Sequence, residues 1–204
     1  MVARKKNSEA GFTLIEIVIA VAIVGIFAAV ISPMVFRHLE DAKLSKAASE
    51  TETVANAMLT YYKDVGQWPF TNNNGKTGSI DRLVSSDNVP TGKGKGANAG
   101  AQKWGKFGKS MYIGDYLFDN SVDNGNGAGS WRGPYTEKHN FNDPWGNAYV
   151  VNVRYLPGGK YTGDKVHKVM VLSAGPDAKW QTTFADGSTE AIAGDDIGYT
   201  LAVQ

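Results

Sequence analysis

The hydrophobic and polar positions divide the chain into an apolar N-terminal segment, an amphipathic segment, and a polar remainder with short apolar runs. Residues 12–31 include no Lys, Arg or Asp and a single acid, Glu16. About 20 apolar residues in a helix cross the ~30 Å hydrocarbon core of a bilayer. The pattern therefore predicts a membrane-spanning helix that carries a carboxylate at membrane depth, where an acid is costly and usually functional.

The helical periodicity continues beyond Pro33, which lacks a backbone donor and is expected to kink or loosen the helix. Apolar or small residues recur there at spacings of three and four, opposite charged residues, which predicts an amphipathic helix with one face packed on a domain. Gly66 and Pro69 are expected to end it. The residues expected on the packed face are Phe36, Leu39, Lys43 or Leu44, Ala47 or Ala48, Thr51, Val54 or Ala55, Met58 or Leu59, and Tyr62.

The remaining sequence predicts loops followed by a small sheet. Residues 67–132 are rich in Gly, Asn, Lys and Ser, a loop composition with little to form a core, interrupted by short apolar stretches at 80–84 and 111–118. Beyond them, β-branched runs at 148–153 and 168–172 flank a turn at 156–159 and predict an antiparallel hairpin or meander. The predicted fold class is α+β, with a long N-terminal helix packed on a small C-terminal antiparallel sheet with long loops.

Composition limits the chemistry that the chain can support. Its 204 residues leave room for one globular domain and a long helix. The absence of Cys excludes a disulfide framework and thiolate chemistry. An extracytoplasmic domain without disulfides is often stabilised by a metal ion or a partner instead. His38, His139 and His167 lie in unrelated contexts, and no motif of a metalloprotease or serine hydrolase is present. We therefore expect a protein that is not an enzyme.

A short basic leader precedes the apolar segment. Small residues, Ala10 and Gly11, lie before the apolar run, whereas the cleavage site of an ordinary secretory signal follows it. The sequence GFTLIE at residues 11–16 resembles the processing site of type IV pilins and type II secretion pseudopilins. The resemblance implies that residues 1–11 are a leader, that a prepilin peptidase cuts between Gly11 and Phe12 and methylates the new N-terminus of Phe12, and that Glu16 becomes the fifth residue.

Cleavage would also change the charges near the N-terminus. Loss of three basic residues and one acidic residue takes the formal charge from +1 to −1, which gives no general argument for binding nucleic acid. The new α-amine of Phe12 would be cationic near neutral pH. Our hypothesis is that Glu16 pairs with the Phe12 amine of a neighbouring subunit during filament assembly. The alternative is that Glu16 lies at the membrane interface, or neutral, in an inert anchor.

Several motifs resemble the major (G-type) pseudopilin of type II secretion. They are the helix exit at 59–69, WRGPY at 131–135, NDPWGNAY at 142–149, SAGPD at 173–177 and GDDI at 194–197, so the resemblance covers residues 1–70 and 131–198. It implies a polymerisation helix at 12–33, an amphipathic helix at 34–66, a variable loop region at 67–132 and a sheet and calcium-loop region at 133–204. The expected function is a structural subunit that polymerises into a periplasmic pseudopilus and drives protein export.

The same resemblance implies partners, a location and a structural ion. The partners are copies of the same chain, minor pseudopilins, prepilin peptidase, and an inner-membrane assembly platform with a cytoplasmic motor ATPase. The chain would cross the bacterial inner membrane once, with its C-terminal domain in the periplasm. The implied Ca²⁺ ligands are Asp177, Asp195 and Asp196, with a backbone carbonyl near Ala174. Further oxygen donors at 178–194 are Asp186, Ser188 and Glu190, and the alternative is that these acids are solvated turn residues.

Two other functions share the helix and the leader. One is a type IV pilin of a surface pilus. The other is a DNA-uptake pilin, since basic and aromatic residues alternate in a pattern suited to single-stranded nucleic acid, although a solvated loop is the simpler interpretation. The residues concerned are Lys93, Lys95, Lys103, Trp104, Lys106, Phe107 and Lys109.

Overall fold

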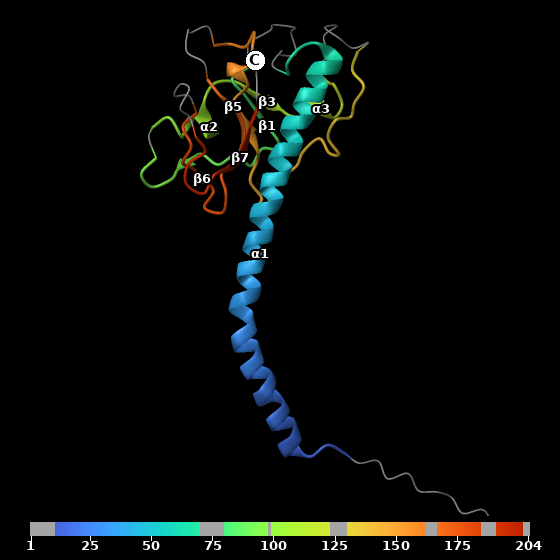
Figure 1. The fold of residues 1–204 in the computed structure, drawn as a ribbon, viewed down its shortest axis with the longest axis vertical. Helices are drawn as coiled ribbons and strands as arrows, with labels where there is room; N and C mark the ends of the chain where they lie inside the picture. The colour runs from blue at the N-terminus through green and yellow to red at the C-terminus, as the bar shows by residue number, and fades with distance from the viewer. Residues whose placement is uncertain are drawn as a thin grey trace, which may run out of the picture. The chain divides into compact units, whose positions relative to one another are not determined.

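The computed structural model describes residues 11–69, 80–97, 99–122, 130–161, 167–184 and 191–201 (Figure 1). Most of the predicted leader, residues 1–10, lies outside the described residues, as do the polar stretch 70–79 and the segment 185–190. The chain forms two compact units, Met1–Ala42 and Lys43–Gln204.

A single long helix, α1, spans Leu14–Val65 and contributes to both units. Pro33, which is expected to kink or loosen the helix, lies within it, and the helix is continuous through that residue. Gly66 ends the helix as predicted: it has a φ of 76°, and its amide donates to the Tyr62 carbonyl at 2.8 Å. A glycine in this left-handed conformation is a common way to satisfy the last carbonyls of a helix.

From Ala47 onward, α1 packs on the domain through the face that the periodicity predicts. The expectation that Phe36 and Leu39 also pack there is wrong, since they are 66% and 51% exposed. The buried residues are Ala47, Thr51, Val54, Ala55, Ala57, Met58 and Tyr61. The expectation that Tyr62 packs in the core is wrong, since it is 40% exposed and stacks on Trp68 at 4.3 Å. Tyr61 takes the buried place because it makes edge contacts with Tyr116 and Tyr135, which the helix sequence cannot reveal.

The domain contains a five-stranded sheet in the order β3-β1-β4-β5-β7. Its strands are β1 (Arg82–Val84), β3 (Ser110–Tyr112), β4 (Val150–Val151), β5 (Val169–Ser173) and β7 (Ile197–Leu201). The pairs are antiparallel except β1 and β3, which are parallel. A second sheet pairs β2 (Gly92–Lys93) with β6 (Lys179–Trp180) in parallel. The predicted α+β fold, with an antiparallel-rich sheet, is confirmed.

The predicted β-branched pair forms, but its first strand is short. Val150 lies opposite Leu172 and Val151 opposite Val171 in the antiparallel ladder. After Val151 the chain turns into the 3-10 helix η1 (Val153–Tyr155). The side chain of Asn152 takes the place of the backbone ladder there, because its Oδ1 accepts a 2.7 Å hydrogen bond from the Met170 amide.

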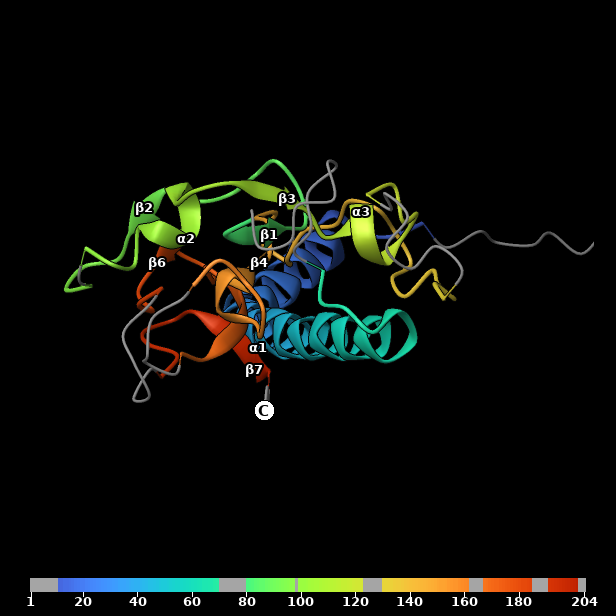
Figure 2. The same ribbon diagram turned by 90° about the horizontal axis from the view of Figure 1, so that it is seen from above.

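Both faces of the sheet are covered, which explains why every residue of β5 is buried. Val169 and Val171 belong to a core shared with α1, whereas Met170 and Leu172 belong to a second core on the other face. Successive side chains of a strand point to opposite faces, so a strand covered on both sides has a continuous apolar sequence. Figure 2 shows α1 beside β7 and β4, with α2 (Lys103–Lys106) and β6 farther along the domain.

β1 and β3 form at the apolar stretches 80–84 and 111–118 that interrupt the loop composition of residues 67–132. The expectation that the Gly- and Lys-rich part between them has little to form a core is wrong, because Trp104 of α2 is fully buried. The Trp104 ring lies 5.8 Å from that of Trp180 and 4.9 Å from that of Phe184. The next residue, Gly105, permits this insertion, because a Cβ atom there would lie 2.1 Å from the Pro90 carbonyl oxygen. One large aromatic residue thus forms a core within a segment of loop-like average composition.

Candidate assembly and cation sites

Glu16 caps the N-terminus of α1 in a reciprocal arrangement with Thr13. Its Oε2 accepts hydrogen bonds from the Thr13 amide at 2.9 Å and from the Thr13 hydroxyl at 2.7 Å, and the Glu16 amide donates to Thr13 Oγ1 at 3.3 Å. This is a capping box, in which a Thr and a Glu three residues later satisfy each other's amides. The sequence interpretation missed this role, although the Thr-x-x-Glu spacing is its recognised signal.

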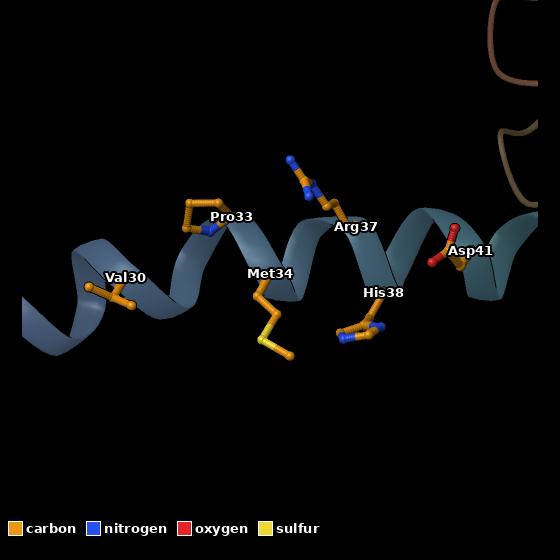
Figure 3. A pocket seen from close by; sticks show the side chains of 6 residues that line it. All are labelled: Val30, Pro33, Met34, Arg37, His38 and Asp41. Atoms are coloured by element: carbon orange, nitrogen blue, oxygen red, sulfur yellow. The ribbon is translucent and has the colours of Figure 1, made fainter.

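The apolar part of α1 ends close to Pro33. No Lys, Arg, Asp or Glu occurs between Glu16 and Arg37, and α1 is the one helix among the described residues that is long and apolar enough to cross a membrane. A shallow groove lies at the end of this stretch, lined by Val30, Pro33, Met34, Arg37, His38 and Asp41. In Figure 3, Pro33 and Arg37 project to one side of the helix and Met34 and His38 to the other. The surface therefore changes from apolar to charged within two turns.

The predicted calcium ligands Asp177 and Asp196 meet at Gln181. The Gln181 side-chain amide donates to Asp177 Oδ2 at 3.0 Å, and its backbone amide donates to Asp196 Oδ2 at 2.9 Å. The Thr182 amide donates to the same Asp196 oxygen at 2.6 Å. Asp177 is exposed and Asp196 is buried. The structure thus brings two of the three predicted side chains to one polar residue that the sequence interpretation did not select.

The third predicted ligand, Asp195, is half-buried and its backbone lies against Gly175. A Cβ atom at Gly175, which has a φ of 64°, would lie 2.2 Å from the Asp195 carbonyl oxygen. This close approach holds the start of the loop, at Ala174 and Gly175, next to its return at Asp195. The predicted donors Asp186, Ser188 and Glu190 lie in the segment outside the described residues.

Asp196 is a buried carboxyl with one oxygen that accepts hydrogen bonds and one that does not. Burial raises the pKa of this carboxyl to about 6, against the hydrogen bonds from Thr182 and Gln181 and with a smaller contribution from Asp195. Asp196 Oδ1 and Gln181 Oε1 are buried and have no hydrogen-bond partner among the described residues. Buried oxygens without donors are rare, and hard cations such as Ca²⁺ bind oxygen ligands. An unpartnered carboxylate oxygen is a suitable Ca²⁺ ligand, but Asp177, Asp195 and Asp196 do not bring their ligand atoms within 4.8 Å of one another, so the calcium site stays a prediction.

The DPWG segment forms a turn organised by Asp143. Asp143 Oδ1 accepts from the amides of Trp145 at 3.0 Å and Asn147 at 2.8 Å, and Gly146 has a φ of 90°. Asp143 Oδ2 also accepts a 2.6 Å hydrogen bond from the hydroxyl of Ser173, the last residue of β5. The turn is thereby tied to the start of the loop that leads to Asp177.

The basic loop lacks the aromatic surface that nucleic-acid stacking requires. Trp104 is fully buried between other aromatic rings. Phe107 is covered by the Arg154 guanidinium, 4.7 Å from its ring centre, and by the Lys103 ammonium at 5.4 Å. These contacts leave the lysines as a solvated charged surface.

A long apolar helix with a capped acid at its start, followed by an amphipathic half packed on an antiparallel-rich sheet, defines a type IV pilin-like protein. Residues 6–32 match the prokaryotic N-terminal methylation motif. The chain is 30% identical over 176 residues to the type II secretion system core protein G of Pseudomonas aeruginosa, covering 86% of this chain and 89% of that protein. The chain therefore belongs to the family of type II secretion system core protein G.

Two other relatives are a second core protein G and a fimbrial protein. The core protein G of Escherichia coli K12 is 28% identical over 179 residues, which cover 88% of this chain and 90% of that protein. The fimbrial protein of Neisseria meningitidis serogroup A is 39% identical over 88 residues, but these cover only 41% of this chain and 52% of that protein. No solved structure matches this chain.

Proposed function

We propose that this protein is the major pseudopilin of a type II secretion system, a structural subunit that polymerises into a periplasmic pseudopilus and drives protein export across the outer membrane. The observation that carries the proposal is the match to core protein G along nearly the whole length of both chains. The match to the meningococcal fimbrial protein covers less than half of this chain. A surface pilin is therefore the less favoured alternative.

Assembly of this subunit would begin with its N-terminus. Cleavage between Gly11 and Phe12 by a prepilin peptidase would leave Thr13 and Glu16 in place, so that the capping box persists in the processed chain. Phe12 and Glu16 are both exposed in the single chain. The Glu16 carboxylate is thus available to the methylated Phe12 amine of a neighbouring subunit, and pairing would reduce the cost of placing both charges at membrane depth.

The proposed location and partners follow from the same role. The apolar part of α1 would cross the inner membrane once, with residues 43–204 in the periplasm. The subunit would form a homopolymer with minor pseudopilins at its tip, on an inner-membrane assembly platform. A separate cytoplasmic motor ATPase would supply the work, so the chain itself would carry no catalytic activity.

We also propose a structural Ca²⁺ held by Asp177, Asp195 and Asp196, with a backbone carbonyl near Ala174. The support is the buried, unpartnered Asp196 Oδ1 and the raised pKa of that carboxyl. When bound, the ion would supply the positive charge that Asp196 lacks. The carboxylates would fix the loop between β6 and β7 on the edge of the sheet.

Locating the filament tests the proposed function. In a strain that lacks its own copy of the gene, the full chain is expected to restore secretion and to be recovered, on cross-linking, as a ladder of multimers in the cell envelope. A chain with Glu16→Leu should restore neither, although it should accumulate to the same level. Recovery of the wild-type chain only in filaments sheared from the cell surface, with secretion unchanged, would overturn the proposal in favour of a pilin.

A further inference from the structure

A second group of cation ligands lies away from the C-terminal acids. Asp115 belongs to the short helix α3 (Gly114–Leu117), Asp119 follows that helix, and His139 comes from the irregular segment before β4. One ligand atom from each of these residues lies within 4.8 Å of the other two. Among the residues that the structure describes, no other such group of three is found. The predicted calcium ligands do not form one.

The distances in this group suit a small divalent ion. His139 Nε2 lies 3.0 Å from Asp115 Oδ1 and 3.7 Å from Asp119 Oδ2. Two ligands in a tetrahedral zinc site, each about 2.1 Å from the metal, lie roughly 3.4 Å apart. The 3.7 Å separation from Asp119 is longer than a normal hydrogen bond, so a protonated Nε2 of His139 donates to Asp115 and not to Asp119. An ion between the three ligand atoms would contact both carboxylates.

Each ligand is held through its other polar atom. Asp115 Oδ2 accepts from the Tyr112 amide at 3.2 Å, and Asp119 Oδ1 accepts from the Ser121 amide at 3.0 Å. His139 Nδ1 lies 2.9 Å from Asn140 Oδ1, and His139 Nε2 lies within hydrogen-bond distance of Asp115 Oδ1 at 3.0 Å. A bound ion would replace a proton on Nε2, while Nδ1 would keep its contact with Asn140. Metal sites in proteins use such outer hydrogen bonds to orient their ligands.

The surroundings fix the imidazole and leave room for a fourth ligand. A Cβ atom at Gly114 would lie 2.3 Å from the His139 carbonyl oxygen, so glycine permits this contact. The ring also lies 6.0 Å from that of Tyr112 and 6.2 Å from that of Phe118. The side chains of His139, Asp115 and Asp119 are 30%, 17% and 42% exposed, which gives water and an incoming ion access to the site.

We propose that Asp115, Asp119 and His139 form a structural site for a divalent transition ion such as Zn²⁺, distinct from the calcium site. One imidazole and two carboxylates suit Zn²⁺ as a three-ligand set completed by water. The ion joins α3 to the irregular segment before β4. In a chain without cysteine, such a link stabilises the fold by cross-linking two segments, as a disulfide would.

The test is titration of the metal-stripped full chain, purified in detergent, with Zn²⁺ alone. We expect one saturable site by calorimetry and a Tm that rises with Zn²⁺ concentration. His139→Ala and Asp119→Asn each weaken binding at least ~10-fold, as expected for loss of a ligand. Asp119 is partly exposed and Asn has the same shape as Asp. Asp119→Asn therefore tests the metal site if His139→Ala does not fold.

Two controls separate this site from other cation binding. His38→Ala removes an exposed histidine on α1 and leaves Zn²⁺ affinity unchanged, and so does Asp196→Asn in the calcium loop. Bound Co²⁺ gives visible absorption bands that are lost in Asp119→Asn. The proposal is overturned if Zn²⁺ binding is not saturable, if Asp119→Asn and His139→Ala bind as tightly as wild type, or if binding is lost in either control.

Discussion

The hydroxyl of Tyr149 donates a 2.5 Å hydrogen bond to the carboxylate of Glu50, joining the residue before β4 to the middle of α1. Tyr149 is fully buried, and burial together with this bond raises the pKa of its hydroxyl. Glu50 is also 3.7 Å from the Lys46 ammonium on the next turn of the helix. The contact thus fixes the position of α1 along the sheet through a directional bond, as does the 2.8 Å hydrogen bond from the Tyr135 hydroxyl to Asp64 near the end of the helix.

Tyr149→Phe is expected to lower the free energy of unfolding by about 2 kcal/mol, because a hydrogen bond to a charged group is lost while the ring remains. Thermal unfolding of the full chain, followed by tryptophan fluorescence, measures the change. Lys46→Gln is the matched control and should cost less than about 1 kcal/mol, since it removes only an exposed ion pair. Equal effects of the two variants would mean that the tyrosine hydroxyl adds nothing.

Glu16→Gln separates capping from charge at the start of α1. Glutamine accepts the same hydrogen bonds from Thr13 and completes a capping box, but it cannot pair with a cationic amine. We expect Glu16→Gln to lose filament assembly, measured by cross-linking in membranes, with no change in the Tm of the folded domain. Thr13→Ala removes the cap but keeps the carboxylate, and it should retain partial assembly. Normal filaments from Glu16→Gln would exclude charge pairing.

Asp81 is fully buried between two cations and should be sensitive to neutralisation. Its oxygens lie 3.2 Å from Arg154 Nη1 and 2.9 Å from Lys160 Nζ, and Oδ2 accepts from the Lys109 amide at 2.9 Å. Asp81→Asn leaves Arg154 largely buried without its partner and should cost about 3 kcal/mol of stability in denaturant unfolding.

The control for Asp81 is Lys160→Gln. The Lys160 side chain is 45% exposed, so its contribution is screened by water and should be below about 1 kcal/mol. A loss for Lys160→Gln as large as that for Asp81→Asn would show that the lysine, and not the arginine, sets the stability of this group.

Chelation and pH should act together on the C-terminal loop. In chelator, the folded state holds a proton on Asp196 up to about pH 6, whereas the unfolded state releases it near its ordinary pKa of 3.8. The folded state binds more protons in this interval, so stability should fall as pH rises from about 4 to about 6, by roughly 3 kcal/mol, and then level off. Asp196→Asn should remove this slope.

Added Ca²⁺ should reverse the trend, because the ion favours the charged carboxylate. We expect the increase in Tm on adding Ca²⁺ to be small at pH 5 and larger at pH 7, since binding at the lower pH must displace a proton. Differential scanning calorimetry of the full chain at both values measures it. An identical increase in Asp196→Asn would remove this residue from the site.

The regular elements were predictable because their patterns are local. α1 buries residues at the helical spacing from Ala47 to Met58, and the β-branched runs that form β4 and β5 are adjacent in the sheet. The parallel pair of β1 and β3 was not predictable in the same way. Each of these strands has only three residues, which is too short to show an alternation of apolar and polar positions. Paired residues such as Arg82 and Ser110 also lie 28 positions apart along the chain.

The sites were predictable only in part. The acids at 177, 195 and 196 could be selected from motifs, but the burial of Asp196 and its contact with Gln181 depend on packing between segments. Trp104 was assigned to a loop because its neighbours are Gly and Lys, whereas its environment is set by Trp180 and Phe184. The capping box at Thr13 and Glu16 is local and could have been found from its spacing alone.

The order of strands has a consequence for how the domain is completed. β5, whose five residues are all buried, lies between β4 and β7, and β7 is contributed by residues 197–201. The edge of β5 therefore stays open until residues 197–201 have been synthesised. A chain shortened before Ile197 would present five unpaired strand positions, four of them apolar, to other copies, the usual starting point for edge-to-edge aggregation. β7 covers the buried, apolar strand β5 and replaces it at the edge of the sheet with a strand whose middle residues are partly exposed.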